Sequence, residues 1–164
     1  MSGPEVSCRE IHAIVTSDKP ARERAELLAG RSELEECLNR GLETTLKARD
    51  WYNFEAYNGM AYRFPSPRYV AHLSSALDLR EAHVQPGDVL LTLGRIRSSD
   101  SIPALERVLE WRPEWDEFDD IAFKALDALA GIDTDAAWRV IESVVDDERG
   151  RVRETANSLL ASRR

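Results

Sequence analysis

Glycine, proline and cysteine are scarce in this chain, with 8, 7 and 2 residues among 164. Together with 43% hydrophobic and 32% charged residues, this scarcity argues against a disordered chain and indicates exposed helix faces. The spacing of Cys8 and Cys37 is not typical of a disulfide framework or a zinc site, and we expect both to be reduced packing residues. His12 follows Cys8 by one helical turn, but two ligands without a second pair do not make a metal site. We predict neither a metal nor a cofactor.

Long apolar runs and an excess of positive charge are also absent. The longest apolar stretches, such as residues 89–93, are too short to span a bilayer, and residues 1–18 lack the pattern of a secretory signal. We therefore expect a cytoplasmic protein without a membrane partner. A formal net charge of −8 argues against binding of nucleic acids, which relies on Lys and Arg to neutralise phosphates. The charge favours a partner with a basic surface, or serves only solubility.

Motifs typical of enzymes are missing as well. The chain has no glycine-rich phosphate loop, no His-Glu-x-x-His pair and no Gly-x-Ser-x-Gly sequence. Glu114 with Asp116 or Asp119 could form a pair of catalytic carboxylates, but acidic turns are far more common than such sites. We predict no catalytic residue and a protein that is not an enzyme.

What the chain does contain is an internal repeat. Two segments match when one is shifted by 36 residues, and all six matched pairs are apolar and helically spaced. Repeats of this length, each a pair of helices, stack into α-solenoids. The pairs are Leu93 with Leu129, Ile96 with Ile132, Ile102 with Trp138, Leu105 with Ile141, Val108 with Val144, and Leu109 with Val145.

Helical periodicity and breakers predict the other elements. A capping box of Ser32 and Glu35 is expected to begin the helix at residues 32–46. Gly131 is expected to end the helix at residues 118–129. The helices are expected at residues 5–16, 21–29, 32–46, 51–62, 66–79, 89–96, 102–111, 118–129, 134–145 and 152–160.

Residues 89–96, Val-Leu-Leu-Thr-Leu-Gly-Arg-Ile, followed by Asp-Ser-Ile-Pro-Ala-Leu at 100–105, resemble the HEAT-like repeat of bacterial proteins and phycobilin lyases. Residues 128–132 and 152–160 resemble parts of the same unit, although Ala136-Ala137-Trp138 replaces its Ile-Pro element. The resemblance implies an all-α fold, a right-handed α-α superhelix, with three helix pairs in residues 66–162. Residues 1–64 are then degenerate repeats or a cap, within a single domain of residues 1–164.

In a solenoid of this kind, the second helix of each pair lines the concave side. Its positions outside the core are therefore the expected binding surface. These positions are Asp88, Thr92, Arg95, Asp119, Asp120, Lys124, Asp127, Glu154 and Ser158.

Two further segments are candidates for binding. Residues 111–120 hold five carboxylates, two tryptophans and a phenylalanine, which suits a basic protein surface. Alternatively, the acids stabilise the start of a helix, and Trp111 or Phe118 fills the space between helices. The candidate residues here are Trp111, Glu114, Trp115, Asp116, Glu117, Asp119 and Asp120.

The second segment is the aromatic-rich stretch 51–69. Tyr52, Tyr62 and Asn58 fall outside its main apolar face and could present hydroxyls or an amide to a ligand. Alternatively, the large rings fill a junction between the N-terminal part and the regular repeats.

Our first hypothesis is a non-enzymatic module that binds a protein with a basic surface. Bacterial HEAT-like proteins of this size resemble immunity or antitoxin partners, which mask a basic toxin. The second hypothesis is a HEAT-like enzyme, of the DNA base glycosylase or chromophore lyase type. The third is a regulatory scaffold subunit. We expect a monomer or a weak dimer.

Overall fold

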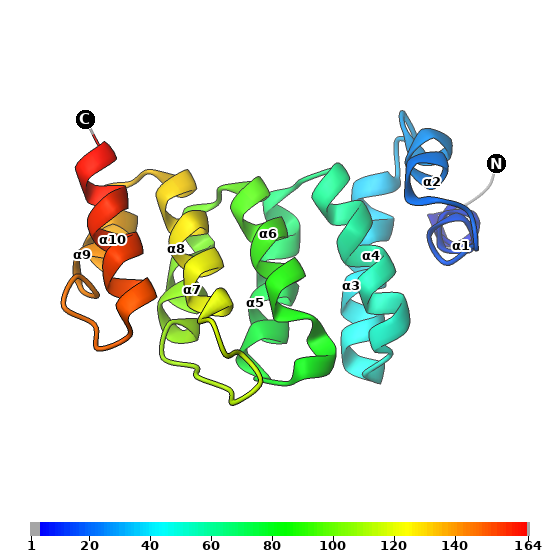
Figure 1. The fold of residues 1–164 in the computed structure, drawn as a ribbon. Coiled ribbons are helices and arrows are strands. Elements are labelled where there is room, and N and C mark those ends of the chain that lie inside the picture. Colours follow the sequence, from blue (N-terminus) through cyan, green and yellow to red (C-terminus); the bar gives the residue numbers. More distant parts are fainter. Residues whose placement is uncertain (1–3, 164) are drawn as a thin grey trace.

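The computed structural model describes residues 4–163, and within that range it contains ten α-helices, three short 3-10 helices and no strand (Figure 1). The prediction of an all-α protein is confirmed. The parts of the single-domain prediction that concern residues 1–3 and 164 lie outside the described residues. None of the helices in the described part is long and apolar enough to span a membrane.

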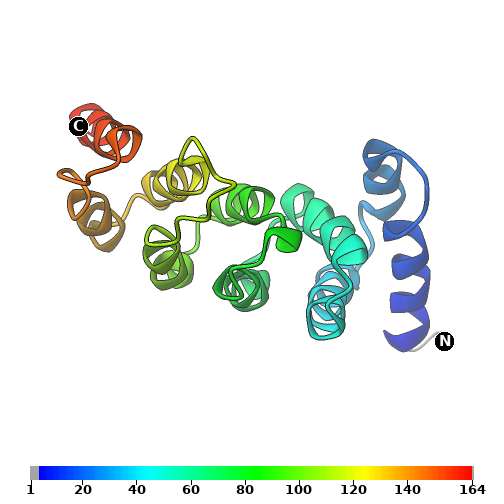
Figure 2. The same ribbon diagram turned by 60° about the horizontal axis from the view of Figure 1, so that its bottom comes forward.

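Eight of the helices form two rows, and the helices of each row pack side by side (Figures 1 and 2). The core lies between the rows and consists of leucine, isoleucine, valine and alanine side chains with a few aromatic rings. The first row consists of α3 (Leu34–Ala48), α5 (Val70–Asp78), α7 (Ile102–Val108) and α9 (Asp135–Glu142). The second row consists of α4 (Trp51–Arg63), α6 (Pro86–Ile96), α8 (Asp120–Ile132) and α10 (Gly150–Ser162).

An N-terminal hairpin closes one end of the stack. Helices α1 (Pro4–Val15) and α2 (Ala21–Leu28) lie across the end formed by α3 and α4 (Figure 2). Ile11, Val15 and Leu28 are fully buried and attach the hairpin to the core. Gly30, in the left-handed conformation at φ +82°, turns the chain after α2 towards the first row.

The shift of 36 residues appears in the backbone geometry as well as in the core. Leu93 of α6 and Leu129 of α8 are both fully buried. The carbonyl of each accepts a hydrogen bond from the residue that ends its helix, Arg97 and Asp133, and both of these are left-handed. Gly131 does not end α8, contrary to our expectation. The helix continues to Ile132 because the left-handed residue that stops it is Asp133.

Other boundaries also differ from the prediction. Helix α7 ends at Val108, before Trp111, and α8 begins at Asp120 because Asp119 is left-handed at φ 55°. The capping box is wrong: α3 begins after Glu33, and no side chain caps its first turn. Short 3-10 turns precede three of the other helices, at Pro67–Tyr69, Ala82–Val84 and Ser99–Ser101.

A disulfide joins Cys8 of α1 to Cys37 of α3, with their Cα atoms 5.1 Å apart. The prediction of two reduced cysteines is wrong, because the crossing of α1 over α3 brings together residues that are 29 positions apart in the sequence. Cys8 is consequently not available as a thiolate ligand. Disulfides are typical of oxidising compartments. The cytoplasmic location stays a prediction.

Candidate functional site

The outer side of α4, α6, α8 and α10, which we call the second-row face, exposes several large apolar side chains. Tyr52 and Tyr62 extend from α4, Leu91 from α6 and Phe123 from α8, with exposed fractions of 78%, 45%, 46% and 37%. Exposed apolar groups that gather on adjacent elements are typical of interaction surfaces, whereas single ones are ordinary. Three neighbouring helices contribute to this group.

Charged residues accompany these apolar groups on the same helices and on α10. The guanidinium of Arg95 lies over the Tyr62 ring at 5.6 Å, and that of Arg151 over the Phe123 ring at 4.4 Å. Asp88 and Asp127 are exposed. The two aromatic rings are therefore partly covered by cations of the chain itself, within favourable cation–π distance.

Most of the predicted positions on the second helices are on the surface. Glu154 and Ser158 of α10 are exposed, and Lys124 is half-buried beside the start of α6, where it is 3.1 Å from Asp120. Thr92 is an exception. It is 1% exposed, and its hydroxyl donates to the carbonyl of Asp88 at 3.2 Å, so its predicted surface position is wrong.

A groove of about 650 Å³ crosses the N-terminal end of the second-row face. Its walls are the turn at residues 15–19 with the start of α2 on one side, and α4 and α6 on the other. Five of the residues proposed from the sequence line this groove: Tyr52, Asn58, Tyr62, Asp88 and Thr92. Its volume lies within the usual range for ligand sites.

Sequence reasoning did not find the other wall of this groove. Asp18, Lys19 and Arg24 belong to the N-terminal hairpin, and no motif connects them with α4. Glu55 of α4 was missed too, although it follows Tyr52 by three residues and shares its helix face. Asn58, expected outside the apolar face, lines the groove but is only 4% exposed.

The acidic aromatic segment between α7 and α8 lies at the edge of the second row, beside the start of α8 (Figures 1 and 2). Asp116 has a structural role there, because its two carboxylate oxygens accept the backbone N–H groups of Asp120 and Ile121 at 2.9 and 3.1 Å. These N–H groups belong to the first turn of α8 and have no partner within the helix. The alternative that acids stabilise this helix start therefore applies to Asp116.

The remaining residues of this segment divide into engaged and exposed side chains. Trp111 is half-buried against the core and meets Trp115 edge to face at 5.8 Å. Asp120 pairs with Lys124 and, at 3.5 Å, with Arg151. The exposed members are Glu114, Trp115, Glu117 and Phe118, and neither glutamate forms an ion pair with another described residue. Phe118 is 70% exposed and fills no space between helices.

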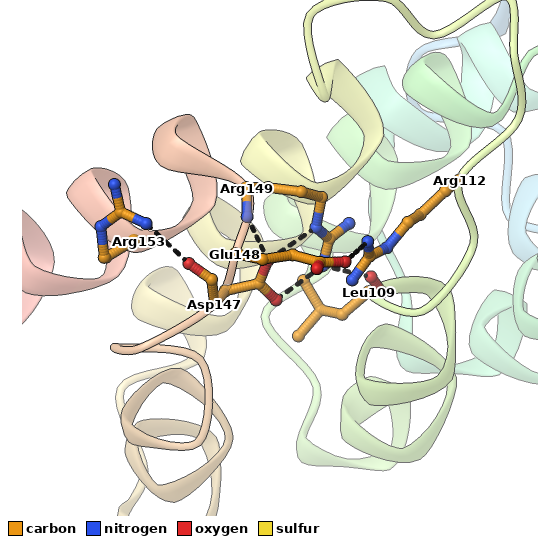
Figure 3. Close-up of polar contacts among 6 residues, drawn as sticks. All are labelled: Leu109, Arg112, Asp147, Glu148, Arg149 and Arg153. Atoms are coloured by element: carbon orange, nitrogen blue, oxygen red, sulfur yellow. Dashed lines mark hydrogen bonds and ion pairs between the residues drawn. The ribbon is translucent and has the colours of Figure 1, made fainter.

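A polar cluster joins the turn between α9 and α10 to the residues that follow α7 (Figure 3). Arg149 donates two hydrogen bonds of 2.9 Å to the two carboxylate oxygens of Asp147, and a third of 2.8 Å to the carbonyl of Leu109. Arg153 donates to the Asp147 carbonyl, and Arg112 pairs with Glu148. Because these partners belong to the chain itself, we interpret the cluster as a structural clamp.

Acid should weaken this clamp. Hydrogen bonds from Arg149 lower the pKa of the Asp147 carboxyl from 3.8 to about 2. The unfolded chain therefore binds a proton at higher pH than the folded chain does, and the stability from this pair is present above pH 3.8 and lost as the pH falls towards 2. After allowance for solvent screening, we expect a loss of about 1–2 kcal/mol.

Urea denaturation between pH 5 and pH 2 measures this loss. The double variant Asp147→Asn, Arg149→Gln is the control, because the other carboxylates titrate in both proteins. An equally steep acid dependence in the variant would contradict the assignment to Asp147.

The described arginines near the C-terminus, up to residue 163, do not form a free basic groove. Arg149 is engaged in the clamp, Arg151 donates to the Phe118 carbonyl at 2.8 Å, and Arg163 is 3.2 Å from Asp135. Among the described residues, no group of three or more His, Cys, Asp or Glu side chains is placed to hold a metal ion.

Comparison of the sequence with models of protein families and with curated proteins finds no match. The resemblance to HEAT-like repeats therefore stays a prediction, and the functional argument depends on the geometry of the second-row face.

Proposed function

We propose that this protein is a non-enzymatic module of the HEAT-like type, a right-handed α-α superhelix whose second-row face binds another protein. The observation that supports the proposal most is the group of exposed Tyr52, Tyr62, Leu91 and Phe123 on three adjacent helices. Protein interfaces combine aromatic and aliphatic anchors with a polar rim. Asp88, Asp127 and the acidic segment beside α8 supply such a rim.

The partner is expected to have a basic surface. The chain has a net charge of −8, and Asp88, Glu114, Glu117 and Asp127 are exposed without a cation partner among the described residues. Complementary charge accelerates association and selects the partner. A module that masks a basic toxin, in the manner of an immunity protein, fits these features, and so does a regulatory subunit of a larger enzyme. We propose that the module acts as a monomer or a weak dimer.

The test begins with capture of the partner from a lysate of the host on the immobilised protein, followed by measurement of its affinity at low and moderate salt. The variant Leu91→Arg, Phe123→Arg should weaken binding more than tenfold, because it removes two anchors and adds like charge. The control Ala71→Arg, Ala136→Arg changes the net charge equally on exposed positions of the first row, in α5 and α9, and should retain the partner.

Either of two results would contradict the proposal: retention of the partner by the face variant, or equal loss in the control. The charge contribution is tested separately with Glu114→Gln, Glu117→Gln, which should reduce the salt dependence of binding. Asp116 stays unchanged in this test, because its loss would also remove the cap of α8.

A further inference from the structure

The groove at the N-terminal end of the second-row face contains hydrogen-bonding groups that the fold leaves unused. Asn58 lines this groove and is only 4% exposed, yet its amide oxygen has no hydrogen-bond partner. Arg24, on the opposite wall, has a buried Nε that is also without a partner. An unsatisfied buried polar group destabilises the folded protein, so such groups call for a ligand or a solvent molecule.

The two groups are complementary to a peptide backbone. The Asn58 oxygen accepts a hydrogen bond and the Arg24 Nε donates one, while each residue of a peptide offers one N–H and one C=O. Rotation about the soft terminal torsion of the Asn58 amide can present its oxygen to a segment that lies in the groove. Two of the four unpaired buried side-chain atoms in the described part of the chain belong to residues that line this groove.

The charge of the groove indicates which side chain such a segment carries. Asp18, Glu55 and Asp88 are exposed there and form no ion pair with a described residue. The lining also holds three cations. Lys19 pairs with Glu23 at 3.8 Å, Arg24 donates to the carbonyl of Val15, and Arg63, in the last turn of α4, forms no ion pair with a described residue. Glu55 lies more than two helical turns before Arg63 on α4, so the carboxylates at the Tyr52 end of the groove favour a cationic side chain of the ligand there.

The tyrosines of the groove support the same ligand. Tyr62 already lies beneath the guanidinium of Arg95, which shows that a cation is accommodated over an aromatic ring of this face. Tyr52 is 78% exposed and has no such cation among the described residues. It precedes Glu55 by three residues on α4, so a guanidinium over its ring also approaches a carboxylate.

From these contacts we infer that the groove receives an extended segment of the partner protein, with an arginine or lysine side chain over Tyr52 and between Glu55 and Asp88. Asn58 and Arg24 hydrogen-bond the backbone of that segment. The inference rests on the proposed function and adds to it where and how the basic partner enters.

The first test uses a fluorescein-labelled peptide with three Gly-Ser-Arg repeats, an otherwise identical peptide with neutral citrulline for arginine, and arginine methyl ester. The arginine peptide should bind with at least tenfold higher affinity than the citrulline peptide, and it should shift the side-chain amide signals of Asn58 in NMR spectra. Equal affinity of the two peptides, or no binding of either at 1 mM concentration (roughly the weakest affinity that a specific site is expected to have), would overturn the inference. Binding of the ester as tight as that of the peptide would show a site for small cations, and would likewise overturn it.

Matched variants separate the groove from the net charge. Glu55→Gln, Asp88→Asn should weaken binding of the arginine peptide about tenfold. The control Glu106→Gln, Glu110→Gln removes the same charge at exposed positions in and after α7, outside the groove, and should have little effect. Gly59 offers a second variant, because no atom lies within 4 Å of a Cβ placed there. Gly59→Leu fills the groove and should abolish binding, while Gly59→Ala should retain it.

The same variants distinguish this inference from the proposed function. If the captured partner is lost with Leu91→Arg, Phe123→Arg but retained with Gly59→Leu, then the second-row face binds and the groove does not. If neither variant weakens binding of the partner, the proposed function fails as well.

Discussion

Replacing Gly41 with alanine should lower the free energy of unfolding by about 3 kcal/mol or more. A Cβ at this position would lie 2.0–2.4 Å from three ring carbons of Tyr57, far closer than van der Waals contact. The ring cannot move away cheaply, since Tyr57 is 3% exposed and its hydroxyl lies 2.7 Å from Nδ1 of His12. Burial also raises the pKa of this hydroxyl to about 12, so the phenol is neutral over the ordinary pH range.

Gly59, in the facing helix α4, is the matched control. Both glycines lie inside helices, where alanine is favoured over glycine by about 0.5–1 kcal/mol, but Gly59 has open space around its Cβ position. Gly59→Ala should therefore stabilise the protein slightly, in contrast to Gly41→Ala. Urea denaturation followed by circular dichroism measures both changes. Equal effects of the two substitutions would contradict the packing of Tyr57 against α3.

Removal of the disulfide between Cys8 and Cys37 should lower the free energy of unfolding by about 3–4 kcal/mol. The two cysteines are 29 positions apart, and without the bond the segment between them gains conformational entropy in the unfolded chain. The N-terminal hairpin is the part most affected, since few fully buried side chains attach it to the stack. Hydrogen exchange of residues 8–28 should increase more than that of α6 and α8. The hairpin also forms one wall of the groove, so peptide binding should weaken with it.

The double variant Cys8→Ser, Cys37→Ser provides the control for reduction. A thiol reductant should lower the denaturation midpoint of the natural protein to that of the double variant and should leave the double variant unchanged. A natural protein whose midpoint does not respond to the reductant, with both thiols shown to be free by alkylation, would contradict a stabilising disulfide.

Local periodicity was sufficient to predict the helices of this protein. The matched apolar pairs, such as Leu93 with Leu129 and Leu105 with Ile141, are buried because helical spacing places them on one side of each helix. Boundaries were less predictable where backbone conformation decides them. Asp133 and Asp119 adopt left-handed conformations, which favour glycine, and the local sequence does not indicate that these two aspartates end or precede a helix in this way.

The candidate site was only partly predictable. Placement on the second helices correctly put Asp88, Arg95 and Asp127 on the surface, because they lie outside the apolar stripe. Thr92 was misplaced since its hydroxyl bonds to the preceding helical turn, which allows a polar residue to be buried. Asp116 was grouped with the binding acids, although its distance from the first turn of α8 makes it a cap.

By itself, then, the sequence determined the helical class, the repeat of 36 residues and the acidic character of the surface. These properties depend on residues that are close together in the chain, or on composition alone. Only the tertiary structure decided that Cys8 meets Cys37, that Gly41 accommodates the Tyr57 ring, and that the hairpin and α4 enclose a groove. Each of these contacts joins separate helices, and their relative placement follows from the packing of the whole core, which no local pattern encodes.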